Sequence, residues 1–195
     1  LGAAGRFGQG DVQWMTAGKG VQHSEMFPLI NTEEENPLLL FQIWLNLPAA
    51  SKNVAPYFGM MGHEDIPIIN EKDDEGRAFS IKIIAGAYKD QKALQPAPDS
   101  WASNPENGIN IWLISLDAHT EFKLPKGIDG SNRSVYFYEG DTLHAEGFDI
   151  PLMHQIKADP TQELTLKNGE QPAKLLLLEG KPMNEPVVQH GPFVG

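Results

Sequence analysis

Glycine and proline recur so closely along this chain that long helices have little room to form. The 195 residues include 19 glycines and 15 prolines, and turn-forming pairs such as Asn107-Gly108 and Asp129-Gly130 separate short apolar runs. A proline inside a helix removes a backbone donor and clashes with the preceding turn. Many short strands with regular turns between them are typical of a β-sandwich or β-barrel. The sequence therefore predicts an all-β fold.

The apolar runs between the turns have the lengths and patterns of strands. Phe79–Ile84 alternates apolar and polar residues, which predicts one buried and one solvated face. Thr120–Leu124 alternates in the same way, with Phe122 and Leu124 facing inward. The runs that we expect to form strands are 39–47, 79–84, 109–116, 120–124, 135–138, 164–167 and 174–178.

Charge and composition exclude several classes of function. The net charge is −11, which argues against direct binding to a nucleic-acid backbone but leaves a basic protein partner open. The absence of cysteine excludes disulfides and thiolate metal sites. The glycine-rich start lacks the pattern of a signal peptide, and no apolar run is long enough for a membrane span. We expect a soluble, cytoplasmic protein without a membrane segment.

A charged, turn-rich stretch divides two blocks that are rich in predicted strands. Residues 62–76 hold this stretch, so we expect an N-terminal domain over 1–61, a linker over 62–76 and a C-terminal domain over 77–195.

The densest segment, residues 10–26, contains the pair His23 and Glu25. In a strand, residues two apart point to the same face, with Cα atoms about 6.5–7 Å apart. An imidazole and a carboxylate that converge on one cavity suit Fe, Mn, Ni, Cu or Zn. The alternative is a hydrogen-bonded surface pair, since stable sites use three or four protein ligands. Trp14 and Met15 are either core residues or the lining of a substrate pocket beside this strand.

Other motifs give weaker signals. Gly18-x-Gly20 lacks the third glycine of a dinucleotide loop, and the chain has no Gly-x-Ser-x-Gly elbow for a hydrolase nucleophile. The remaining histidines form no metal-binding spacing with one another, and His190, beside a Gly-Pro turn, is interpreted as a support for the backbone. These other histidines are His63, His119, His144, His154 and His190.

Three segments resemble one known family. Residues 10–26 (GDVQWMTAGKGVQHSEM) resemble the signature of the pirins, 41–47 (FQIWLNL) resemble the strand that follows it, and 185–194 (EPVVQHGPFV) resemble a second block. The three occur in the family's order and at about its spacing. The chain is therefore identified as similar to pirins over essentially its whole length.

The resemblance implies two cupin-type β-barrels of the jelly-roll (double-stranded β-helix) kind, the N-terminal one incomplete. In pirins a metal, usually iron, is held by three histidines and one glutamate, which maps the last histidine and the glutamate onto His23 and Glu25. The other two histidines come from a His-Pro-His segment that this sequence lacks. We therefore expect a chain cut at both ends, with exposed strand edges and apolar faces, that holds little metal by itself.

The resemblance also implies two kinds of function. The first is a metal-dependent oxidoreductase of the quercetin 2,3-dioxygenase type, which acts on a flavonol-like small molecule, with Glu25 as a base towards a substrate hydroxyl. The alternative is a metal-dependent regulator that binds a protein partner, either as a transcription cofactor or as a modulator of a metabolic enzyme. A cupin without activity is the third option, because one fold hosts many functions.

Overall fold

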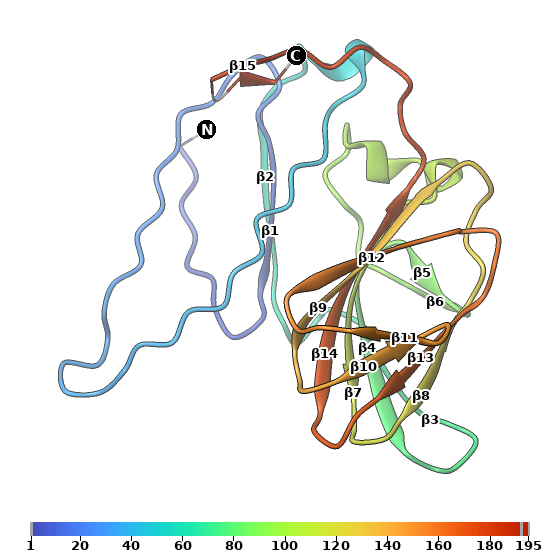
Figure 1. The fold of residues 1–195 in the computed structure, drawn as a ribbon. Helices are drawn as coiled ribbons and strands as arrows, with labels where there is room; N and C mark the ends of the chain where they lie inside the picture. Colours follow the sequence, from blue (N-terminus) through green and yellow to red (C-terminus); the bar gives the residue numbers. More distant parts are fainter. Residues whose placement is uncertain (1, 192, 195) are drawn as a thin grey trace.

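The computed structural model describes residues 2–191 and 193–194 and confirms the all-β prediction. A compact barrel built from two facing sheets carries most of the strands, and an open N-terminal part lies beside it (Figure 1). The three helices in the described residues are single 3-10 turns: η1 (Ala49–Ser51), η2 (Trp101–Ser103) and η3 (Pro105–Asn107). None of them is long and apolar enough to cross a membrane.

The barrel comprises a six-stranded sheet in the order β12-β9-β14-β7-β4-β3 and a four-stranded sheet in the order β11-β10-β13-β8. All pairings in both sheets are antiparallel. The strands of the larger sheet are β3 (Ile68–Lys72), β4 (Ala78–Ala85), β7 (Asn110–Leu116), β9 (Asn132–Glu139), β12 (His154–Ala158) and β14 (Ala173–Gly180). Those of the smaller sheet are β8 (Glu121–Leu124), β10 (Leu143–Ala145), β11 (Phe148–Ile150) and β13 (Leu164–Asn168).

The main core lies between the two sheets. Phe79 and Phe122 meet there from opposite sheets, with ring centroids 5.2 Å apart. Alternation delivers these residues to the inside, because every second side chain of a strand points to the same face. Six of the seven predicted strands are present with shifted ends, namely β4, β7, β8, β9, β13 and β14.

The larger sheet is buried on both faces, which explains the unbroken run Leu175–Leu178 in β14. Leu175 and Leu177 belong to the core between the sheets, whereas Leu176 belongs to a second cluster on the outer face. Met61 and Ile66 join this outer cluster, and Trp14 packs against it. The N-terminal part therefore covers the back of the C-terminal barrel.

In the described residues before 62, the N-terminal part has one pair of strands of five residues each, β1 (Val12–Thr16) and β2 (Tyr57–Met61). The loop after β1 closes tightly at Gly18, whose φ is +52° and where a Cβ atom would lie 2.2 Å from the carbonyl oxygen of Val54. Residues 21–48 run as long strandless loops, drawn in blue in Figure 1. The strand predicted over 39–47 is therefore wrong, because these residues have no neighbouring strand to pair with.

Large apolar side chains are exposed along these loops, as expected for an incomplete barrel. Met26 and Leu29 are 88% and 78% exposed. The others in this part of the chain are Phe27, Ile30, Leu38, Leu39, Leu40, Phe41, Ile43 and Trp44. Side chains of this kind normally lie inside a protein or an interface.

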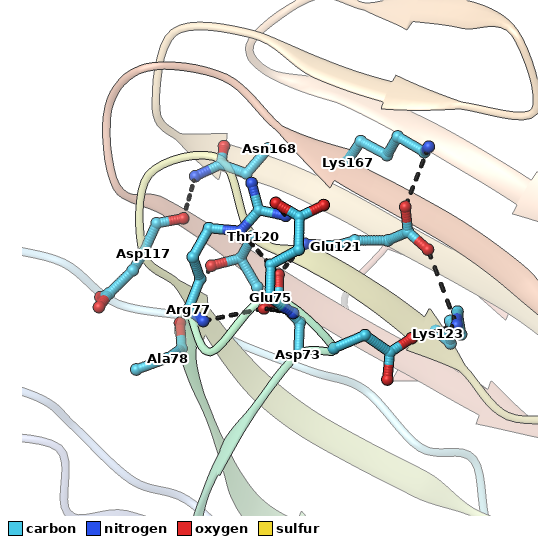
Figure 2. Close-up of polar contacts among 11 residues, drawn as sticks. Asp73, Glu75, Arg77, Ala78, Asp117, Thr120, Glu121, Lys123, Lys167 and Asn168 are labelled. Carbon is cyan, nitrogen blue, oxygen red and sulfur yellow. Dashed lines mark hydrogen bonds and ion pairs between the residues drawn. The ribbon is translucent and has the colours of Figure 1, made fainter.

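The predicted linker over 62–76 contains strand β3, which pairs with β4 as the edge of the larger sheet. Figure 2 shows how the turn after β3 docks on β8: Asp73 accepts bonds from the backbone nitrogens of Arg77 and Glu121, at 2.8 and 2.9 Å. These bonds, the one from Glu121 above all, lower the pKa of Asp73 to about 2. The domain boundaries at 61 and 77 stay a prediction.

Two short hairpins complete the fold. One joins β5 (Ala87–Tyr88) to β6 (Gln91–Lys92), and the other joins β15 (Gln189–His190) to β16 (Phe193–Val194).

Candidate metal-binding segment and neighbouring sites

His23 and Glu25 lie in the extended loop that follows β1, and both are exposed. No strand runs through them in the described residues, because β1 ends at Thr16 and pairs only with β2, so the strand geometry considered for this pair is not found. Within the described residues, neither side chain has a hydrogen bond or an ion pair. The surface-pair alternative is thus not realised either. Their role as metal ligands stays a prediction.

The donor types of this pair fit a borderline divalent metal, but the pair is too small for a closed site. An imidazole nitrogen and a carboxylate oxygen suit Fe, Mn, Ni, Cu or Zn. Stable sites use three or four protein donors, and the described residues bring no third one to His23 and Glu25. The pair by itself therefore supplies fewer protein donors than a stable site uses.

A second group of possible ligands lies where β1 begins and β2 ends. One donor atom each from Asp11, His63 and Glu64 lies within 4.8 Å of the others. Asp11 Oδ1 accepts from the backbone nitrogen of His63 at 2.8 Å and lies 3.0 Å from its Nδ1, and Glu64 Oε2 lies 3.2 Å from the same Nδ1. The side chains of His63 and Glu64 are 48% and 68% exposed, so water competes with a metal ion for contact with their ligand atoms.

The electrostatics of this group point to a structural role. The bonds from the backbone nitrogens of His63 and Gly8 lower the pKa of Asp11, so its carboxylate stays charged. Burial lowers the pKa of Lys82, which donates to the carbonyl of Gly10 at 2.6 Å. The bonds of Asp11 join the start of β1 to the end of β2, and the bond from Lys82 fastens this pair to β4. The sequence did not predict this group, because Asp11 and His63 are far apart along the chain.

The other histidines have local partners or none at all. His144 pairs with Asp149 across β10 and β11, and Nδ1 of His154 lies 3.1 Å from the carbonyl of Leu152. His119 adopts a φ of +62° in a turn. His190 is an exposed residue of the last hairpin, and the described residues give it no side-chain hydrogen bond.

Trp14 and Met15, predicted as core or as a pocket lining, lie in β1 and are half-buried. Trp14 packs on the outer cluster, as expected for a core residue. A cavity of about 440 Å³ does open nearby, but Phe41, Trp44 and Tyr138 line it instead of these two. The pocket role of Trp14 and Met15 stays a prediction.

The two facing antiparallel sheets around one core define the C-terminal part as a cupin-type barrel. A solved quercetin 2,3-dioxygenase from Acinetobacter baumannii is similar in fold, with a TM-score of 0.66 and 24% identity over 95% of this chain and 60% of that one. A protein from Geobacillus kaustophilus gives a TM-score of 0.61 and 26% identity, over 93% and 67% of the two chains.

Sequence comparison narrows the class to one family. The pirin family model matches residues 1–45, and the model of the pirin C-terminal cupin domain matches residues 111–195. A Pseudomonas aeruginosa protein provisionally named quercetin 2,3-dioxygenase is 35% identical over 99% of this chain and 63% of its own length. Rat pirin is 31% identical over 99% of this chain and 61% of its own length. The chain belongs to the pirin family and spans somewhat less than two thirds of these relatives.

Proposed function

We propose that this chain is part of a metal-dependent oxidoreductase of the quercetin 2,3-dioxygenase type, located in the cytoplasm. The observation that carries the proposal is the match of the pirin family model to residues 1–45, which include His23 and Glu25. The identity with relatives provisionally named quercetin 2,3-dioxygenase supports it.

In this proposal His23 and Glu25 hold iron or another divalent metal, together with histidines that this chain does not contain. A metal with an open coordination position would supply Lewis-acid and redox chemistry towards a flavonol and dioxygen. Glu25 would also accept the proton of a substrate hydroxyl, a role open to an accessible carboxylate that has no hydrogen bond or ion pair among the described residues.

The test uses the longest native form of the protein that contains this chain, loaded with iron under oxygen. We expect quercetin absorbance to fall together with oxygen uptake, and Glu25→Gln and His23→Gln to abolish both. Glu34→Gln is the matched control, because Glu34 is an exposed carboxylate in a neighbouring loop. Unchanged flavonol absorbance with verified iron occupancy would contradict the proposal.

A second candidate is a metal-dependent regulator that binds a protein partner. The observation that favours it is the apolar surface around Leu38–Trp44, where Leu39 and Trp44 are 64% and 65% exposed beside the 440 Å³ cavity. The family names of the relatives, pirin and pirin-like protein, are compatible with either function. In a pull-down with the iron-loaded protein, a partner whose affinity depends on the iron oxidation state would support this candidate. Equal affinity in both oxidation states would count against it.

A further inference from the structure

One end of the C-terminal barrel holds a cavity of about 510 Å³. Its lining comes from β5 and the turn after it, the end of β8 and the loop that follows, the first residues of β7 and β9, and the end of β14. A volume of 300–1,000 Å³ is typical of sites for small organic ligands. This cavity is distinct from the 440 Å³ cavity beside Trp44, here called the apolar groove, because the two share no lining residue. Neither His23 nor Glu25 lines it.

A buried ion pair forms one wall of the cavity. Nη2 of Arg133 donates to both oxygens of Glu179, at 3.1 and 3.2 Å, and both side chains are 1% exposed. Glu179 also accepts from Ser131 Oγ at 3.1 Å and from Asn110 Nδ2 at 3.2 Å. The carboxylate therefore has its acceptor positions occupied, and it is the one carboxylate in the lining.

The donors of this wall are only partly used. Nε of Arg133 and the indole Nε1 of Trp112 have no hydrogen-bond partner in the described part of the chain, and both residues are 3% exposed. Nη1 of Arg133 reaches only the carbonyl of Gln162, at 3.5 Å. Since a buried donor without an acceptor costs free energy, nearly all such groups in native proteins are paired. Both side chains line the cavity and offer it N–H groups that have no acceptor among the described residues.

The rim adds further positive charge to this wall, although the chain as a whole carries −11. Lys89 and Lys123 each pair with an acidic neighbour outside the lining, namely Glu71 and Asp74. Lys126 is exposed and has no ion pair among the described residues. The three lysines and Arg133 carry four positive charges and Glu179 carries one negative charge, so the lining has a formal charge of +3.

The remaining walls are aromatic and apolar. The rings of Tyr88 and Trp112 meet edge to face with centroids 5.4 Å apart, and Pro125 and Ile128 close the other side. Burial raises the pKa of Tyr88 to about 12, so its hydroxyl stays neutral. Flat apolar walls with a positive edge complement a ring that carries a negative group.

We propose that this barrel mouth binds a small aromatic carboxylate, whose ring lies against Tyr88 and Trp112 and whose charge faces Lys126 and Arg133. The site is independent of the metal segment, and it needs no residue from outside this chain. It gives the C-terminal barrel a ligand of its own.

The test titrates the full chain with 2-naphthoate and follows the indole ¹⁵N–¹H signals of its four tryptophans by NMR. Trp112→Phe assigns the Trp112 signal. 2-Naphthamide, with the same ring system and no charge, is the ligand control. Lys126→Glu is compared with Lys157→Glu, which makes the same change in net charge at an exposed lysine of β12 that lies outside the cavity. A cooperative thermal transition verifies the fold of each variant.

We expect a saturable shift of the Trp112 signal with 2-naphthoate and at least tenfold weaker binding of 2-naphthamide. Lys126→Glu should weaken the binding of 2-naphthoate about fivefold, as expected for reversal of one screened charge. Lys157→Glu should weaken it less than about twofold. No saturable shift of Trp112, or equal effects of the two substitutions, would overturn the proposal. A shift confined to Trp44 would also overturn it, because that residue lines the apolar groove instead.

Discussion

The buried pair Arg133–Glu179 allows a sharp test of how the C-terminal barrel is held together. Arg133→Met removes the cation and leaves the Glu179 carboxylate, 1% exposed, with only Ser131 and Asn110 as partners. Breaking one side of a buried ion pair costs about 3–5 kcal/mol, because the remaining charge is stranded away from water. Glu179→Leu strands the guanidinium in the same way, since its other contact is the carbonyl of Gln162 at 3.5 Å.

The double variant Arg133→Met/Glu179→Leu should be far less damaging than either single change suggests. Replacement of a buried pair by apolar side chains is often close to neutral. Ser131 retains the carbonyl of Ile128 as an acceptor at 2.7 Å, so the loss of Glu179 leaves mainly Asn110 without a partner, at about 1–2 kcal/mol. The expected coupling between the two positions is therefore at least about 3 kcal/mol in the free energy of unfolding.

Urea unfolding followed by tryptophan fluorescence measures all four corners of this cycle, because Trp112 lies in the core and reports on its loss. When the same fluorescence is followed on heating, each single variant should melt roughly 6–20 °C lower, from about 3–5 kcal/mol at about 2–4 °C per kcal/mol for a chain of this length. A loss of less than about 1 kcal/mol in the free energy of unfolding of each single variant would refute the reasoning. Losses that simply add in the double variant would refute it as well.

Three further predictions concern single residues. The pKa of Asp73 is lowered to about 2, so the stability that its carboxylate contributes should be complete above the ordinary pKa of 3.8 and be lost as the pH falls towards 2. Asp73→Asn should flatten this part of an acid-unfolding curve. Gly127→Ala should destabilise the barrel by about 2 kcal/mol or more in urea unfolding, because its Cβ would lie 1.7 Å from Glu179 Oε1. Gly18→Ala should speed amide hydrogen exchange in the β1–β2 pair, because the new Cβ would meet the Val54 carbonyl.

The C-terminal barrel could be predicted from sequence because its strands have clear local signals. Phe79–Ile84 and Thr120–Leu124 alternate, and alternation in a strand is a direct consequence of one buried face. Strand β3 was missed, since Ile68–Lys72 holds two charged residues and lies among turns at the sheet edge. The segment 39–47 has the composition of a strand, but a strand forms only where a neighbour supplies hydrogen bonds.

The candidate sites were predictable only in part, and for a physical reason. His23 and Glu25 stand close together in the sequence, so a family signature exposes them. Asp11 and His63 meet only through the pairing of β1 with β2. Arg133 and Glu179 meet because β9 and β14 pair in a register that brings the two residues opposite each other. No local pattern marks contacts of this kind.

The central claim is that His23 and Glu25 are part of the metal site of a pirin. The most direct test is metal analysis of the longest native form, with His23→Gln/Glu25→Gln compared with His63→Gln/Glu64→Gln, which removes two donors of the other group. We predict about one iron per chain in the native form and in the His63 and Glu64 variant. We predict loss of that iron in the His23 and Glu25 variant, and little in residues 1–195 alone. Retention of stoichiometric iron after substitution of His23 and Glu25 would contradict the account.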